Sequence, residues 1–317
     1  MQSSPQEKTD QYRRIGGPVK EGGDGVRLDA YLGSQFPFLS RTEWKAKIQD
    51  EMLLGISGAL RPTYKVQVGD VFYLYHPPTV EPEVDKGIYP IWKKSGIMAC
   101  YKPSNLPMHE NGPYRKNTFA AVLVEDFGEE WAAVHRLDRE TSGIVLCGNT
   151  PQLRKALADS LAQRAVQKRY IAIGAGRPLA ESWVEKGPIG DLKGSEIRIK
   201  KWVVADGLPA ETFFRVKGQK GEKVLLEAWP KTGRTNQIRI HAAYAGLPLL
   251  GEKLYHPDEN VFLDYFNARR TRAPKPNIIK GADRLCLHAE SIEFTHPESG
   301  ERCIVHCPPP EDMLCFW

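Results

Sequence analysis

The sequence predicts an α+β fold, in which helices flank a largely antiparallel mixed β-sheet and a smaller α/β unit precedes it. Three observations support this fold class. Short apolar runs typical of strands recur from Ile88 onward, among them residues 143–147, 169–175 and 223–229. One long helical pattern interrupts them, at residues 150–166. A proline-rich acidic stretch separates this part from the smaller unit.

Composition divides the chain into four segments. Residues 1–23 are polar and glycine-rich without hydrophobic periodicity, so a disordered leader is expected there. Residues 24–76 make up the small unit. Residues 77–87, PPTVEPEVDKG, have the composition of a flexible acidic linker. Residues 88–317 then form the larger domain.

The small unit contains two helix patterns followed by two strand patterns. Leu28, Tyr31 and Leu32 recur at helical spacing. Ser40 stands before RTEWKAKIQ with Glu43 three residues further on, which predicts a capping box at the start of a second helix. The strand patterns are LLGIS and VFYLY. The exposed side of the second helix carries three cations: Arg41, Lys45 and Lys47.

The composition is that of a globular protein, with 41% hydrophobic and 26% charged residues and a net charge of +5. This mild basic charge permits a nucleic acid as partner, but it is equally compatible with a metabolic enzyme. No apolar run approaches the ~18 residues of a membrane span, and no signal peptide is evident, so a cytoplasmic protein without a membrane partner is expected.

The six cysteines include no CxxC pair and are expected to be reduced thiols. Cys303, His306 and Cys307 lie close together in the stretch RCIVHCPPP and could suggest a metal site. No second pair of ligands stands nearby, and the stretch is more typical of a short strand. We therefore expect no metal.

The stretch VHRLDRETSGIVL, residues 134–146, concentrates charge directly before a strand pattern. Asp138 stands between Arg136 and Arg139. From the charge pattern alone, a structural ion pair is the more common interpretation of such an aspartate, with catalysis as the alternative.

Three other segments combine polar and apolar residues in a similar way. In KTGRTNQIRIH, the pattern around Arg239 indicates partial burial, which would require an acidic partner, whereas Arg234 could belong to a solvated basic face or grip a phosphate. Tyr170 opens an apolar run in QKRYIAIGAG and could equally be a core residue. Lys102 ends a short apolar strand in ACYKPSNLPMHE.

Together these segments resemble the RluA-type RNA pseudouridine synthases. The stretches that carry the resemblance occur in that family's order and cover about Ile88 to the C-terminus: YKPSNLPMH, HRLDRETSGIVL, KRYIAI, TGRTNQIRIH, GLPLLGEKLY and LCLHAESIEFTHP. The small unit, with RLDAYL and LSRTEWKAKI, is similar to the alpha-L RNA-binding motif of ribosomal and synthetase proteins, which precedes the catalytic domain in many members.

The resemblance implies an enzyme that isomerises uridine to pseudouridine in RNA. Asp138 falls on the catalytic aspartate, Tyr170 on the base-stacking tyrosine and Arg239 on the arginine that pairs with the carboxylate. Arg136 is implicated in extruding the target base. Further substrate contacts are expected from His135, Lys102, Arg234 and Gln237, and RNA contacts from Arg41, Lys45, Lys47 and the basic loop 269–280.

The chemistry fits a carboxylate without a cofactor, because moving the sugar from N1 to C5 of uracil involves no redox step. The carboxylate could attack C1′, remove a 2′ proton or stabilise positive charge on the sugar. It must be ionised in each case, and a neighbouring guanidinium is expected to lower its pKa. A monomer that acts on ribosomal or transfer RNA is the expected form.

The chain departs from the family pattern at three positions. Asn236 stands where histidine is usual, Glu252 where aspartate is usual, and Ser57 where asparagine is usual in the small motif. Two other functions remain open: a non-catalytic RNA-binding or ribosome-assembly factor on the same fold, and a nucleosidase that acts on free nucleosides.

Overall fold

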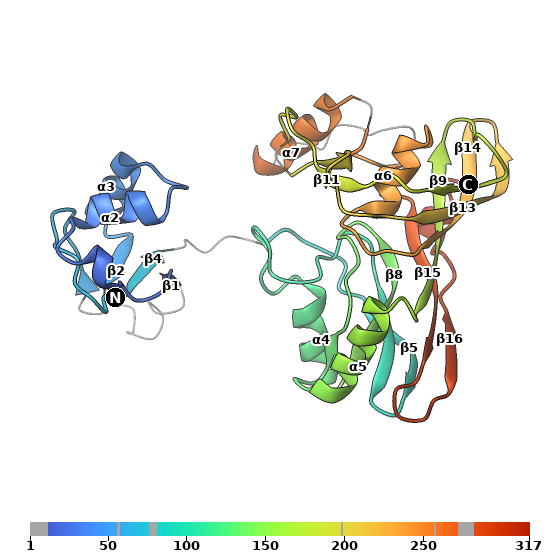
Figure 1. The fold of residues 1–317 in the computed structure, drawn as a ribbon, viewed down its shortest axis with the longest axis horizontal. Coiled ribbons are helices and arrows are strands. Elements are labelled where there is room, and N and C mark those ends of the chain that lie inside the picture. The colour runs from blue at the N-terminus through green and yellow to red at the C-terminus, as the bar shows by residue number, and fades with distance from the viewer. Residues whose placement is uncertain (1–11, 56–57, 76–80, 198, 257, 272–281) are drawn as a thin grey trace. The chain divides into compact units, whose positions relative to one another are not determined.

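The structure, a computed structural model, describes residues 12–55, 58–75, 81–197, 199–256, 258–271 and 282–317. The chain divides into two compact units, Met1–Val80 and Glu81–Trp317 (Figure 1). Each unit is described by itself.

The N-terminal unit contains a small antiparallel sheet and two helices. The sheet order is β1-β4-β2-β3, and the helices α2 and α3 pack against each other. A compact core with Leu28, Leu32, Trp44 and Ile48 lies between the helices and the sheet. The elements are β1 (Tyr12–Ile15), η1 (Glu21–Gly23), α2 (Leu28–Gln35), α3 (Arg41–Gln49), β2 (Leu53–Gly55), β3 (Gly58–Ala59) and β4 (Phe72–Tyr75).

The capping box predicted at the start of α3 is confirmed. The Ser40 hydroxyl accepts a hydrogen bond from the backbone N–H of Glu43, and the Glu43 carboxylate accepts one from the backbone N–H of Ser40 at 2.7 Å. Two of the N–H groups that a helix start leaves without partners are thereby satisfied.

The expectation of a disordered leader over residues 1–23 is wrong for the described part of that segment. Tyr12–Ile15 form the edge strand β1, which pairs antiparallel with β4. Val19 is buried and donates its backbone N–H to the carbonyl oxygen of Asp70 at 2.9 Å. Pairing with a strand sixty positions away stabilises a segment whose own sequence shows no periodicity. Residues 1–11 lie outside the described residues.

The prediction of a linker over residues 77–87 is also wrong for its described part, residues 81–87. The Glu81 carboxylate accepts hydrogen bonds from the backbone N–H groups of Lys116 at 2.9 Å and Asn117 at 2.7 Å, and the Asn117 side chain donates to the carbonyl of Pro82. Val84 packs against the core of the larger unit. The larger unit therefore begins at Glu81 rather than at Ile88, and residues 77–80 lie outside the described residues.

The larger unit is built around one extended mixed sheet. Its strands follow the order β10-β13-β14-β9-β15-β8-β6-β5, with β16 paired to β15 and β7 to β8. The pair β8–β15 is parallel, and the other pairs of this sheet are antiparallel, which confirms the predicted fold class. The elements up to β10 are β5 (Tyr89–Lys94), β6 (Ile97–Lys102), α4 (Phe119–Phe127), β7 (Ala132–Ala133), β8 (Ser142–Gly148), α5 (Pro151–Ala162), β9 (Gln167–Ala175) and β10 (Ser182–Glu185).

The remaining elements complete the sheet and add a two-stranded ribbon, β11–β12. Helix α6 packs against β12, β13 and β14. These elements are β11 (Ile189–Asp191), β12 (Lys201–Val203), β13 (Thr212–Lys220), β14 (Lys223–Pro230), α6 (Gln237–Tyr244), α7 (Asn260–Thr271), β15 (Leu287–Thr295), β16 (Arg302–His306) and α8 (Glu311–Leu314).

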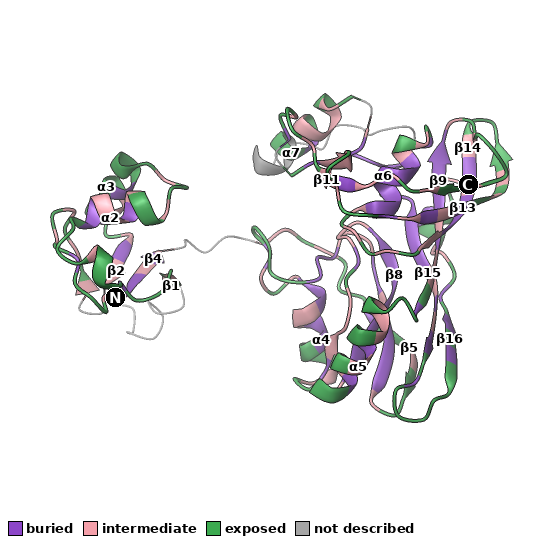
Figure 2. Cartoon of the chain, in the orientation of Figure 1, coloured by how far each residue is buried: buried purple, intermediate pink, exposed green. Residues whose placement is uncertain are grey.

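Strand β8 is buried along its whole length (Figure 2). Ile144 and Leu146 pack into a core that includes residues of α5, whereas Val145 and Cys147 pack into a core that includes residues of α4. The two helices therefore cover opposite faces of the sheet at this strand. Burial on both faces explains why the sequence here is a continuous apolar run rather than an alternating one.

Glycine is required where β8 meets β15. Gly143 has a φ of +118° and pairs with Ala289 in the parallel ladder. A Cβ built on Gly143 would overlap the carbonyl oxygen of Ala289, so a side chain would separate the two strands. This close approach fixes the end of the loop that carries the HRLD stretch.

Several local predictions are confirmed in the larger unit. Helix α5 begins after Thr150, whose hydroxyl accepts a hydrogen bond from the backbone N–H of Leu153. The stretch around Cys303 is strand β16, in which Cys303 is buried and His306 is exposed on the other face.

Two further expectations concern the surface. The basic loop predicted over residues 269–280 begins within α7, and its residues 272–280 lie outside the described residues. None of the helices in the described part of the chain combines the length and apolar character that crossing a bilayer requires.

Candidate active site

Asp138 lies in the loop that joins β7 to β8. The backbone N–H of Val134 donates to the carbonyl of Leu146 at 2.9 Å, which ties the start of the loop to β8. The backbone N–H of Thr141 donates to the carbonyl of Asp138 at 3.1 Å and closes a turn just before the strand. The Asp138 side chain remains 20% exposed, so its carboxylate lies near the surface of an otherwise buried region.

Arg239, on α6, is the buried cation of the site. Its guanidinium donates to both carboxylate oxygens of Glu252 at 2.7 Å and to the side-chain oxygen of Asn236 at 3.1 Å. Nη1 of Arg239 also lies 3.6 Å from Oδ2 of Asp138. The predicted proximity of Asp138 and Arg239 is therefore present, but the bidentate partner of Arg239 is Glu252.

Glu252 is held by backbone contacts as well. One of its carboxylate oxygens accepts hydrogen bonds from the backbone N–H groups of Leu254 at 2.9 Å and Tyr255 at 3.2 Å. The preceding Gly251 has a φ of +72°, and a Cβ there would overlap the carbonyl oxygen of Arg284. This turn therefore requires glycine, and it holds the Glu252 carboxylate in the orientation that bonds to Arg239.

Glu140 forms a second ion-pair centre two residues after Asp138. Its carboxylate lies 2.9 Å from Lys253 Nζ, 3.4 Å from Arg139 and 3.9 Å from Arg239. Burial alone would raise the pKa of Glu140, but Lys253, Arg139 and Arg239 outweigh it and lower the pKa to about 2. Arg139, which the sequence left without a role, therefore braces Glu140.

The electrostatics of Asp138 differ from the expectation. Burial raises the pKa of Asp138 above its ordinary value, although the charges of Arg239 and Arg136 act in the opposite direction. The predicted lowering of the pKa is therefore wrong in its net direction. The sequence indicated the nearby cations but not that the surrounding residues would bury most of the Asp138 side chain.

Tyr170 lies on β9. It shares a rung of the sheet with Gly143, at the end of the Asp138 loop, and β15 lies between the two strands. Ala289 of β15 pairs with Gly143 on one side and with Tyr170 on the other, and Tyr170 pairs with Ala228 of β14. Tyr170 is buried and is part of the hydrophobic core of this unit. Burial, followed by the charge of Asp138, raises the pKa of the Tyr170 hydroxyl, so this group is protonated at neutral pH.

Three residues predicted to bind substrate have hydrogen-bond partners within the protein. Lys102 is 0% exposed, and its ammonium donates to three backbone carbonyls, those of Pro103, Leu106 and Arg139. Burial lowers the pKa of Lys102 to about 7, which Asp138 partly opposes. Lys102 therefore holds the Asp138 loop, and its contact with substrate stays a prediction.

His135 and Gln237 also bond to groups within the protein. Nε2 of His135 accepts the backbone N–H of Leu146 at 3.1 Å, and burial lowers the pKa of His135 to about 3, which keeps the ring neutral. The side-chain oxygen of Gln237 accepts from Thr232, and its nitrogen donates to the carbonyl of Glu211. Both side chains are used to fix the backbone.

The remaining predicted cations differ in their exposure and in the partners that they bind. Arg136 is exposed beside Asp138, and Arg234 is half-buried with its Nε donating to the carbonyl of Pro209. In the N-terminal unit, Lys45 is exposed. Arg41 makes two hydrogen bonds to Asp29, and Nζ of Lys47 lies 3.9 Å from Sδ of Met52.

Sequence reasoning missed the roles of Glu140 and Lys253. Each stands beside a residue that was already singled out, Glu140 in DRETSG and Lys253 in LGEKLY. Asn236 and Glu252 were noted only as departures from a family pattern. Their shared contact with Arg239 shows that the two departures occur in one hydrogen-bonded group.

Comparison with known proteins identifies the class to which this sheet and site belong, the RNA pseudouridine synthases. A profile of the family described as RNA pseudouridylate synthase matches residues 96–244. Ribosomal large subunit pseudouridine synthase D of Xanthomonas campestris is 30% identical over 310 residues, which cover 93% of this chain and 89% of that protein. Ribosomal large subunit pseudouridine synthase C of Haemophilus ducreyi is 28% identical, covering 90% and 88%.

Solved structures agree at the level of the fold. Human RNA Pseudouridylate Synthase Domain Containing 1 has a TM-score of 0.57 at 20% identity, and the match covers 75% of this chain and 91% of that one. The chain belongs to the RluA family of RNA pseudouridine synthases and is thus an isomerase that converts uridine to pseudouridine in RNA.

Proposed function

We propose that this enzyme isomerises uridines of large-subunit ribosomal RNA and that Asp138 is its catalytic carboxylate. Relatives that match nine-tenths of the chain are named as ribosomal large subunit pseudouridine synthases. The observation that carries the assignment of Asp138 is its position: a partly exposed carboxylate 3.6 Å from a buried arginine that other groups already hold in place.

The proposed reaction breaks the bond between N1 of uracil and C1′ of the ribose and forms a bond between C5 and C1′, while C5 loses its proton and N1 gains one. Asp138 either bonds to C1′ or removes the 2′ proton, and both routes require the ionised carboxylate. Arg239 favours this form and, because Glu252 and Asn236 restrain the guanidinium, offers it a fixed positive charge.

The target base must leave its stack before Asp138 can reach the sugar. Arg136, exposed beside Asp138, is proposed to occupy the space that the extruded base leaves. Tyr170 is proposed to face the uracil, because it shares a rung of the sheet with Gly143 at the end of the Asp138 loop and the charge of Asp138 acts on its hydroxyl. A single base–aromatic contact of this kind contributes about 1–3 kcal/mol to binding.

The test is to map pseudouridines in total RNA from cells with and without the gene. We expect one or more positions in large-subunit ribosomal RNA to lose the modification and to regain it with the wild-type gene. Asp138→Asn should not restore it, whereas Asp126→Asn, a change at an exposed acid on α4, should. Equal restoration by Asp138→Asn would refute the catalytic assignment, and losses confined to other RNAs would refute the substrate.

A further inference from the structure

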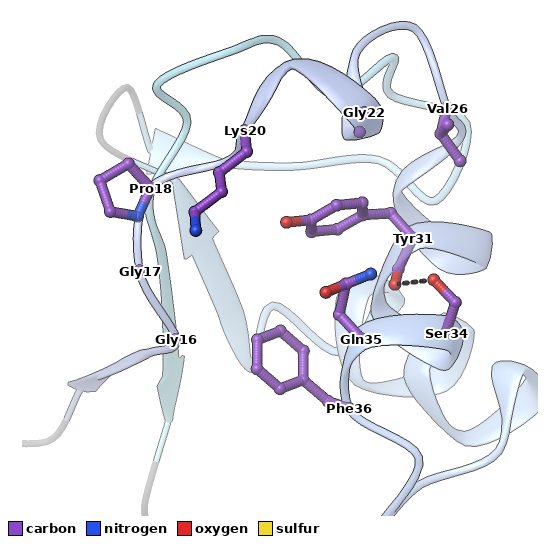
Figure 3. Close-up of a pocket in the computed structure, with 11 residues that line it drawn as sticks. Gly16, Gly17, Pro18, Lys20, Gly22, Val26, Tyr31, Ser34, Gln35 and Phe36 are labelled. Carbon is purple, nitrogen blue, oxygen red and sulfur yellow. Dashed lines mark hydrogen bonds between the residues drawn. The ribbon is translucent and has the colours of Figure 1, made fainter.

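The N-terminal unit contains a cavity of about 470 Å³, within the ~300–1,000 Å³ range typical of small-ligand sites (Figure 3). It lies between the glycine-rich segment before α2 and the C-terminal end of that helix. The residues that line it are Gly16, Gly17, Pro18, Lys20, Gly22, Gly23, Val26, Tyr31, Ser34, Gln35 and Phe36.

Two aromatic rings form rigid walls of the cavity. The Tyr31 ring packs 6.2 Å from that of Phe72, and the Phe36 ring packs 6.2 Å from that of Trp44. Trp44 also donates its indole N–H to the carbonyl of Phe36 at 3.1 Å. Phe38, 64% exposed, lies 6.2 Å from Phe36 and extends the aromatic surface. The walls are thus held in place without a ligand, which reduces the entropy lost on binding.

Glycines allow the backbone to approach these rings closely. A Cβ on Gly16 would lie 2.7 Å from the Phe36 ring, and one on Gly23 would lie 2.7 Å from the Tyr31 ring. Gly17 and Gly22 differ, because a Cβ at either position would meet no atom within 4 Å. Gly16 and Gly23 therefore let the backbone pack against the rings, whereas Gly17 and Gly22 leave open space in the cavity.

The polar groups of the cavity suit a planar heteroaromatic ligand that carries a phosphate. Figure 3 shows the Gln35 amide between the two rings in this view, where it could donate to and accept from a base edge. Lys20 is an exposed cation that extends from the opposite wall. The Ser34 hydroxyl donates to the carbonyl of Tyr31 at 2.9 Å, so it supports the helix end rather than the ligand.

The charge of the unit favours contacts to bases over contacts to phosphates. Residues 1–80 contain ten lysines and arginines against nine aspartates and glutamates. A surface that bound RNA mainly through its backbone would show a clear excess of positive charge. Stacking and hydrogen bonding are the means this cavity offers instead.

The geometry points to a binding site for one unpaired nucleobase of the RNA substrate, stacked against Tyr31 and Phe36 with its phosphate near Lys20. This inference deepens the proposed function, because it gives the N-terminal unit a base-specific contact with the RNA that the larger unit modifies. It does not depend on which RNA is modified or on the role of Asp138.

The test uses the full-length protein and fluorescein-labelled single-stranded RNA of ten nucleotides, together with an abasic version of the same strand. Gly22→Leu should fill the cavity without strain, and Tyr31→Ala should remove one wall. Ala59→Leu adds the same apolar side chain at an exposed position of β3 and serves as the control. Thermal unfolding verifies that each variant is folded.

We expect Gly22→Leu and Tyr31→Ala to weaken binding of the base-bearing strand about 10-fold, as loss of one stacked base implies, and to leave binding of the abasic strand unchanged. The loss should be similar at low and high salt, because the contact is not ionic. Strands with 4-thiouridine should crosslink to Tyr31 or Phe36 in the wild type.

Wild-type affinity in both cavity variants, or crosslinks confined to the larger unit, would overturn the inference. Pseudouridine formation is measured separately, with ribosomal RNA as substrate. If the protein modifies ribosomal RNA but shows no crosslink at the cavity, the inference about the cavity is refuted and the proposed function is not. A protein that crosslinks there but modifies no ribosomal RNA supports the cavity and refutes the proposed substrate.

Discussion

Arg239 and Glu252 form a bidentate ion pair with two hydrogen bonds of 2.7 Å, and both side chains are buried. Asp138 lies 3.6 Å from the same guanidinium, beyond the length of a good hydrogen bond. The strongest bonds of Arg239 therefore go to a residue that does not reach the surface. Asp138 therefore receives a fixed positive charge, and its lone pairs stay available for the role that we propose.

The first prediction concerns Glu252→Gln. Loss of the charge leaves a buried guanidinium with Asn236 and the more distant Asp138 and Glu140, so we expect the free energy of unfolding to fall by about 3–5 kcal/mol. Activity should fall even where the protein stays folded, because Arg239 loses its orientation. Urea unfolding and single-turnover assays measure the two effects.

A matched control for this variant is Glu301→Gln, which removes one partner of a half-exposed ion pair with Lys94. We expect no measurable change in stability or rate, since exposed pairs contribute little. If Glu252→Gln and Glu301→Gln had the same effect on stability and rate, the ion pair between Glu252 and Arg239 would matter no more than an exposed ion pair.

The second prediction is the pH dependence of the reaction. The proposed role of Asp138 requires the ionised carboxylate, and burial raises its pKa, so the rate of a single turnover should decline as the pH falls toward this raised pKa. The decline should begin above the ordinary value of about 3.9 for aspartate. A rate that stayed constant down to that value in folded enzyme would contradict the assignment.

The third prediction concerns the stability of Asp138→Asn. The folded state binds the Asp138 proton more tightly than the unfolded state, because its pKa is raised on folding. The stability contributed by this group is present below the unfolded pKa and is lost as the pH rises through the folded pKa. Asp138→Asn should therefore be inactive yet at least as stable as the wild type at pH 7, and its advantage should shrink as the pH falls. Lower stability than the wild type at pH 7 would show that the carboxylate supports the fold.

Local signals in the sequence predicted local structure correctly. The helix starts at Ser40 and Thr150 depend on side chains that bond to backbone groups three residues away, so adjacent residues contain the whole interaction. Strand β1 could not be found in this way, because Tyr12–Ile15 are stabilised by pairing with β4. Long-range pairing leaves little trace in a short polar segment.

The site shows the same limit. A buried Arg239 was predicted to need an acid, and the sequence offered Asp138, but the distances assign the bidentate role to Glu252. Lys102 and His135 were predicted to contact substrate, and both side chains lie at the Asp138 loop. Only the structure shows that their polar atoms are used by backbone carbonyl and N–H groups.

The fourth prediction compares two glycines near Glu252. Gly251 and Gly246 have similar positive φ values, +72° and +78°. A Cβ on Gly251 would overlap the carbonyl of Arg284, whereas one on Gly246 would meet nothing within 4 Å. Gly246→Ala should cost about 1–2 kcal/mol from backbone strain alone. Gly251→Ala should cost clearly more and should also reduce activity, since it displaces Glu252. Equal costs in urea unfolding would mean that the turn has room to adjust.

The fifth prediction separates two cations on α3 that the sequence treated alike. Arg41 makes two hydrogen bonds to the buried Asp29, which also binds Arg27, whereas Lys45 is exposed. Arg41→Ala should lower the free energy of unfolding by about 0.2–1 kcal/mol, because the pair is partly solvated. Lys45→Ala should leave stability unchanged and weaken binding of structured RNA, with a loss that shrinks as salt increases. Urea unfolding measures stability, and filter binding at two salt concentrations measures affinity for RNA.

If Arg41→Ala lost affinity without losing stability, Arg41 would be an RNA contact rather than a brace for Asp29. Unchanged binding by Lys45→Ala at low salt would exclude this lysine from the RNA-binding surface.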